Sequence, residues 1–147
     1  MGGLDSIPVR VEGGVDVGYA TDNLRPVLLQ VEQALSDLIE RGEPTIIDLA
    51  AMPFSEQDER QLREQLGLGE VSARLEALGP TLIQETGYSG VWLVEHQDAQ
   101  QRRLTLHIEI AMIPEILQTP RDDLSDALAA LRRAHPTDSD AQTEDAQ

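Results

Sequence analysis

The chain has 147 residues, 40% of them hydrophobic, and a formal net charge of −16; all eleven of its basic residues are arginine. This length fits one domain with a sizeable core, and so few clustered cations disfavour binding to nucleic acids or anionic membranes. The absence of cysteine excludes disulfides, thiolate metal sites and cysteine-ligated iron–sulfur clusters within the chain. With no run of 18 apolar residues and no secretory signal, we expect a cytoplasmic protein that does not enter membranes.

The first predicted elements are a short strand and a long helix. Residues 1–20 are rich in glycine and predict a flexible segment, with an edge strand at Ile7–Val11, where Pro8 is tolerated. Residues 22–41 predict an amphipathic helix that Asp22 or Asn23 caps and Gly42 ends. Its expected apolar face consists of Leu24, Val27, Leu28, Val31, Leu35, Leu38 and Ile39.

A strand and a surface helix are expected next. The run Thr45–Leu49 is apolar and rich in β-branched residues, which predicts a strand buried on both faces. Ser55 and Asp58 resemble a capping box, so a helix should follow to about Leu66. Only Leu62 and Leu66 face inward in that helix, which is typical of a surface position.

The hydrophobic period then changes to that of strands. Residues 71–77 and 103–110 alternate between apolar and polar side chains, and residues 81–86 and 90–96 supply two further strands. Short connections, including a polar loop at residues 97–102, predict an antiparallel meander.

Two more helical segments and a tail complete the expected chain. Residues 113–117 predict a helical turn, and Thr119–Pro120 starts a helix to about Arg133, with Leu124, Leu128 and Leu131 in one stripe. We expect one α+β domain over residues 21–133, with an antiparallel sheet of about four or five strands and two or three helices packed on one face. Residues 134–147 predict a disordered acidic tail.

Few residues suggest catalysis. His96 and His107 lie near opposite ends of the 97–102 loop, and on one face they would approach each other beside Glu95 or Glu109. Such a group could serve a small hydrolase, but no third ligand specifies a metal site. Asp48 interrupts the apolar strand, where a buried carboxylate could act as a general base, cap a turn or pair with an arginine. No phosphate-binding or nucleophile motif is present, so we expect no enzyme, no cofactor and no metal.

The single tryptophan lies in the stretch ETGYSGVWLVEH, residues 85–96. The strand that contains it is apolar on both faces, because Trp92 alternates with Val94 and Val91 with Leu93. This strand is either central in the sheet and covered on both sides, or one face meets a partner. Trp92 is accordingly a core anchor or a recognition residue.

The order and spacing of several short motifs resemble the hydrogenase expression/formation HupH (HyaF-like) family over residues 22–132. The motifs are Gly69–Ala73, Ile83–Thr86, Gly90–Trp92, Ile108–Ile110 and Ile113–Leu117. The resemblance implies candidate partner-binding or family-marker residues, which are Tyr88, Gly90, Val91, Trp92, Pro114 and Glu115. It assigns no catalytic residue.

The same resemblance implies an accessory, chaperone-like role in the maturation of uptake nickel–iron hydrogenase. The implied partners are the precursor of the iron–sulfur small subunit and other hydrogenase accessory proteins. Longer family members carry additional sequence, so a single domain could have a reduced role. A structural domain that forms homo-oligomers through the Trp92 face stays open as an alternative, beside the histidine-dependent hydrolase.

Overall fold

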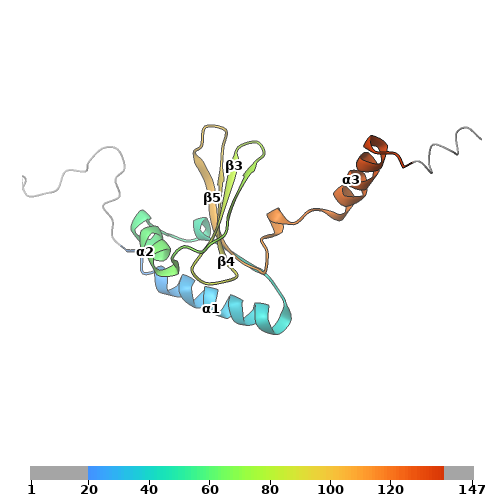
Figure 1. Ribbon diagram of the computed structural model, residues 1–147. Coiled ribbons are helices and arrows are strands. Elements are labelled where there is room, and N and C mark those ends of the chain that lie inside the picture. Colours follow the sequence, from blue (N-terminus) through green and yellow to red (C-terminus); the bar gives the residue numbers. More distant parts are fainter. Residues whose placement is uncertain (1–19, 138–147) are drawn as a thin grey trace, which may run out of the picture. The chain divides into compact units, whose positions relative to one another are not determined.

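A computed structural model describes residues 20–137, which form two compact units divided between Met112 and Ile113. The predicted strand at Ile7–Val11 and most of the predicted acidic tail lie outside the described residues. The first unit holds a five-stranded antiparallel sheet and two α-helices, so the α+β class is confirmed (Figure 1). Its elements are α1 (Leu24–Arg41), β1 (Thr45–Asp48), η1 (Leu49–Ala51), α2 (Glu56–Leu66), β2 (Ser72–Glu76), β3 (Pro80–Glu85), β4 (Val91–Gln97) and β5 (Arg103–Ile110).

The strand order is β1-β5-β4-β3-β2, with every neighbouring pair antiparallel. Strands β2 to β5 form the predicted meander, and β1 adds to the free side of β5. Strand β4 is therefore central, which explains its apolar run. Figure 1 shows the β2–β3 and β4–β5 hairpins extending beyond the helices.

Helices α1 and α2 cover one face of the sheet, called here the helix face. Because residues opposite each other in antiparallel strands share a face, the register Val91↔Ile110 and Leu93↔Ile108 assigns these four side chains to the helix face. They form one core with both helices. Its buried members are Val27, Val31, Ala34, Ile47, Leu49, Leu62, Leu66, Val91, Leu93, Leu106, Ile108 and Ile110.

The helix ends follow from local residues. Gly42 takes the left-handed conformation, φ 69°, and its N–H bonds to Leu38, which ends α1 as predicted. Helix α2 begins with the predicted capping box, because Ser55 and Asp58 each accept a hydrogen bond from the other's backbone N–H. Asn23 precedes α1 without a capping bond, and its side-chain amide donates to the Pro53 carbonyl instead.

Two expectations about burial were wrong. Ile39 is 84% exposed, because at 3.6 residues per turn it lies roughly 110° around α1 from the centre of the buried stripe. Ala34, which was not among the predicted residues, belongs to that stripe together with Val27 and Val31. Strand β1 is an edge strand with only Ile47 buried, so it is not covered on both faces.

The second unit contains the short helix η2 (Glu115–Leu117) and α3 (Arg121–Ala134). Both correspond to predicted elements, and α3 ends one residue beyond the expected Arg133. Acidic residues occupy the first turn of α3 and Arg132 and Arg133 the last, which suits the helix dipole. Within the described residues, no helix is long and apolar enough to cross a membrane.

Candidate partner-binding site

Trp92 is a core residue on the face of the sheet opposite the helices. It pairs in register with Glu85 on β3 and Glu109 on β5, whereas its neighbours Val91 and Leu93 point to the helix face. Only 7% of Trp92 is exposed, and its indole N–H donates to the Ala111 carbonyl at 3.0 Å. A buried indole with its one donor satisfied is typical of a residue that anchors the fold.

Tyr88, four residues earlier, is the exposed aromatic of this stretch. It lies in the turn between β3 and β4 with 55% of its surface exposed. Thr86 fixes the turn, because its hydroxyl oxygen accepts a hydrogen bond from the Tyr88 N–H and its own amide donates to the Val91 carbonyl. The Val91 N–H then donates to the Tyr88 carbonyl at 3.0 Å. The backbone of Tyr88 is therefore held while its ring faces outward.

Glycines attach this turn to the helices. Gly87 donates its N–H to the Leu66 carbonyl at the end of α2, at 2.8 Å. A Cβ on Gly87 would lie 2.9 Å from that same oxygen, so a side chain would push the turn off α2. Gly90 has φ +85° and lies close to Leu35 and Leu38 of α1. The turn is consequently seated against both helices.

An apolar groove of about 320 Å³ runs beside Tyr88, between α1 and α2. Its lining is called here the Tyr88 groove and consists of Leu28, Val31, Glu32, Leu35, Gln65, Leu66 and Tyr88. Leu28 and Leu35 lie on the flank of α1, roughly 90° from the buried stripe, which leaves them only partly covered by the sheet. Glu32 is the one charged residue in this lining, so the groove combines an apolar floor with a negative rim.

The remaining predicted marker residues are divided between the two units. Val91 is fully buried in the helix-face core, and Gly90 supplies backbone geometry. Pro114, which is buried, and Glu115, which is exposed, belong to the second unit, at the start of η2. The groove residues on α1 and α2 escaped prediction, although the partly apolar flank of α1 was visible in the helical spacing.

A second groove, of about 540 Å³, lies on the helix face beside the edge strand β2. Leu82, Leu93 and Leu106 contribute apolar surface there, and Arg63 and Arg74 line it. Both arginines already face carboxylates, Arg63 at Glu59 and Arg74 at Glu76. The charges in this groove are thus largely compensated.

The two strand histidines do meet, as the sequence allowed. The ring centroids of His96 and His107 are 5.8 Å apart, and the Thr81 hydroxyl lies 2.8 Å from His96 Nδ1. Burial, only partly offset by Glu109, lowers the pKa of His107, which favours the neutral imidazole. Glu95 points to the helix face, away from this pair. Among the described residues, no group of three histidine or carboxylate side chains could hold a metal ion.

Two aspartates act as caps. Asp48 is exposed rather than buried, and it accepts a hydrogen bond from the Ala50 N–H at 2.9 Å, so the predicted turn-capping role is confirmed. Asp58 is fully buried and accepts bonds from the Thr21 hydroxyl at 2.6 Å and the Ser55 N–H at 2.9 Å. Burial raises the pKa of Asp58, but these hydrogen bonds outweigh it and hold the pKa below its ordinary value.

An ion-pair cluster connects α2 to the sheet. Arg103 of β5 binds both carboxylate oxygens of Glu59, at 2.7 and 2.8 Å, and its Nη1 lies 3.4 Å from Glu95. Burial raises the pKa of Glu59, but Arg103 and Arg63 outweigh it and lower the pKa. These contacts fix α2 on the sheet and so one wall of the Tyr88 groove.

Known proteins are similar to this chain in sequence. Residues 21–136 match the family described as HupH hydrogenase expression protein, C-terminal conserved region. The chain is 31% identical over 112 residues to the hydrogenase expression/formation protein HupQ of Azotobacter chroococcum, covering 75% of this chain and 39% of that protein. It is 32% identical over 90 residues to the hydrogenase-1 operon protein HyaF of Escherichia coli, covering 61% of this chain and 32% of HyaF.

A solved structure from the same family is also similar to this chain. The hydrogenase expression protein HupH from Thiobacillus denitrificans superimposes with a TM-score of 0.75 at 41% identity, over 77% of this chain and 94% of that one. The chain spans about two-fifths of the length of the HupQ and HoxQ relatives from Azotobacter. It therefore belongs to the HupH hydrogenase expression protein family and contains that family's C-terminal conserved region.

Proposed function

We propose that this protein is a non-catalytic, cytoplasmic accessory factor in the maturation of uptake nickel–iron hydrogenase. It binds the precursor of the iron–sulfur small subunit through the Tyr88 groove, alongside other hydrogenase accessory proteins. The relatives named for hydrogenase expression and formation support the maturation role. The observation that carries the binding role is an exposed aromatic, Tyr88, held on a rigid turn at the rim of an apolar groove.

The chemistry of the groove favours protein binding over catalysis. Aromatic side chains on fixed backbone are common anchors at interfaces, because they bury much area at little entropic cost. The groove lining contains no histidine and a single carboxylate, Glu32. An apolar floor with a negative rim suits an apolar segment that carries a basic residue.

The acidic balance of the whole chain supports the same kind of client. A net charge of −16 attracts basic segments and speeds their encounter with the protein. We expect the precursor segment in contact with the groove to be basic and apolar, such as an arginine-containing leader and the region beside it. Binding should weaken as salt is raised, because salt screens this attraction.

Co-purification tests this proposal. The tagged protein is expressed with the small-subunit precursor and the neighbouring hydrogenase genes, and captured proteins are identified by mass spectrometry. Wild type and the control variant L78A, altered at a hairpin tip where Leu78 is fully exposed, should recover the precursor, and Y88A should not. Equal recovery of the precursor by wild type and Y88A would show that the Tyr88 groove does not bind it. Failure of all three proteins to recover the precursor would refute the binding role.

A further inference from the structure

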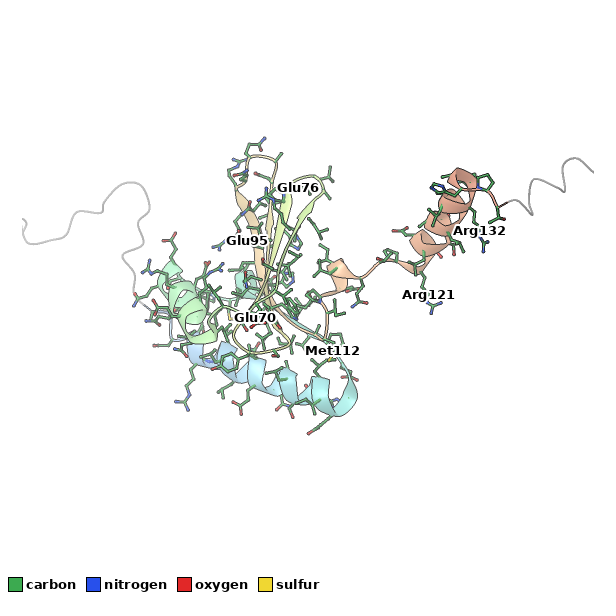
Figure 2. The ribbon with its side chains drawn as sticks, in the orientation of Figure 1. Glu70, Glu76, Glu95, Met112, Arg121 and Arg132 are labelled. Atoms are coloured by element: carbon green, nitrogen blue, oxygen red, sulfur yellow. The ribbon has the colours of Figure 1, made fainter. Side chains whose placement is uncertain are left out.

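Strand β2 has an outer edge with which no other strand of the described residues pairs. The Val71 carbonyl and the Ala77 N–H both bond toward β3, and backbone groups alternate in direction along a strand. The N–H and C=O groups of Ser72, Arg74 and Glu76 therefore point outward. No residue of β2 is buried, and Figure 2 shows Glu76 on the part of the sheet that lies away from α1 and α2. This edge is accessible to another strand.

The sequence of this edge complements itself when two copies run antiparallel. With Leu75 opposite Leu75 of the other copy, each Arg74 lies opposite a Glu76. Ala73 lies opposite Ala77 in the same register. The outward backbone groups of Arg74 then face those of Glu76, as a hydrogen-bonded pair requires. Charges on an edge strand usually discourage pairing, but here they favour one register, because centring the pair on Arg74 would oppose two arginines.

Both charged side chains are available for this contact. Arg74 and Glu76 form an ion pair within β2, and 53% and 62% of their side-chain surfaces are exposed. Around the two-fold axis of the antiparallel pair, the four charges alternate in sign, so each arginine lies between a carboxylate of its own strand and one of the other copy. Because β2 is already a formed strand, pairing adds little cost of ordering its backbone.

We propose that two copies of this chain associate through their β2 edges, with the two-fold axis at Leu75, and join two five-stranded sheets into one continuous sheet. The contact is isologous and closes at two copies. A strand cannot pair with itself inside one chain, so this contact exists only between copies. The lining of the Tyr88 groove shares no residue with β2, so the dimer does not depend on the proposed function and carries two such grooves.

Sedimentation of charge-reversed variants at increasing protein concentration tests the pairing. R74E and E76R should each raise the dissociation constant of the dimer about tenfold or more, because two opposite-charge pairs become like-charge pairs. An equimolar mixture of R74E and E76R should restore association, because an edge with two carboxylates then faces an edge with two arginines. The control variant E43R, altered at an exposed position outside β2, should associate like wild type.

Disulfide formation in the natural cysteine-free background tests the register. Ala73 of one copy and Ala77 of the other form a non-hydrogen-bonded pair, whose Cα separation of about 4.5 Å permits a disulfide. A mixture of A73C and A77C should therefore oxidise to a heterodimer several-fold faster than either variant alone forms a homodimer. Two copies of the same position lie about four residues, or roughly 13 Å, out of register.

Three results would overturn the assignment. A monomeric wild type, with no disulfide between A73C and A77C, would show that the β2 edges do not pair. A dimer that both charge reversals leave unchanged would place the interface elsewhere. Residues 10–12 repeat the arginine, apolar, glutamate order of β2, so they are the competing occupant within one chain. A double variant G13C/A73C that closes a disulfide inside one chain, while the mixture gives none, would place that segment on the edge instead.

Discussion

Replacing Trp92 by phenylalanine tests whether this tryptophan is structural. The change removes the buried hydrogen bond from the indole N–H to the Ala111 carbonyl and leaves that carbonyl without this donor. An unsatisfied buried polar group costs about 1–3 kcal/mol, and the smaller ring adds a packing loss of about 1 kcal/mol. We expect W92F to lower the free energy of unfolding by about 2–4 kcal/mol in total.

Urea unfolding followed by circular dichroism measures this loss, because fluorescence of the single tryptophan disappears in the variant. The midpoint should fall at an unchanged slope, and Tm should drop by roughly 4–8 °C per kcal/mol, as is typical of a domain of about 100 residues. The matched variant Y88A should change stability by less than about 0.5 kcal/mol, since Tyr88 is an exposed side chain. A W92F protein of wild-type stability that fails to bind the precursor would refute the reasoning and make Trp92 the recognition residue.

Three further predictions concern the framework of the groove. D58N should lower the free energy of unfolding by about 2–3 kcal/mol near neutral pH. The folded pKa of Asp58 is depressed, so the stability it contributes is complete above the unfolded pKa of about 3.9 and is lost as pH falls through the folded pKa. The free energy of unfolding of D58N should therefore fall less steeply in acid than that of wild type. An acid limb as steep in D58N as in wild type would contradict this. A double-mutant cycle on Arg103 and Glu59 should give a coupling of about 0.5–1 kcal/mol in the free energy of unfolding. The coupling should weaken in high salt, because Arg103 is partly exposed. A coupling of zero would show that this ion pair does not stabilise the fold. G69A should lower the free energy of unfolding by about 1–3 kcal/mol, measured by thermal unfolding, because a Cβ there would lie 2.4 Å from the Thr86 carbonyl oxygen. An unchanged Tm would contradict this and show that the backbone moves to accommodate the methyl group.

Much of the fold was predictable because local signals agree with the final structure. The period of α1, the capping box at Ser55 and the alternation of residues 103–110 each specify an element through nearby residues. The centrality of β4 was also within reach, since a strand apolar on both faces needs cover on both sides. These features depend on periodicity and capping, which a linear sequence carries.

Other features could not be predicted because they depend on which strands and helices contact one another. Asp48 and Ile46 are exposed because β1 is an edge strand. It is an edge strand because β5 is the only strand that pairs with it in the described sheet. The Tyr88 groove was missed for a similar reason. Its walls come from α1, α2 and the β3–β4 turn, and a hydrogen bond between Gly87 and Leu66, 21 positions apart, joins the last two.

The central claim is that the Tyr88 groove binds the small-subunit precursor. The most direct measurement is the dissociation constant of the purified precursor for wild type, Y88A and L78A, by titration calorimetry at fixed salt. Loss of a buried aromatic anchor of about 2 kcal/mol or more corresponds to a weakening of roughly thirtyfold, so Y88A should bind at least that much more weakly while L78A matches wild type. Equal dissociation constants for all three proteins would contradict the account.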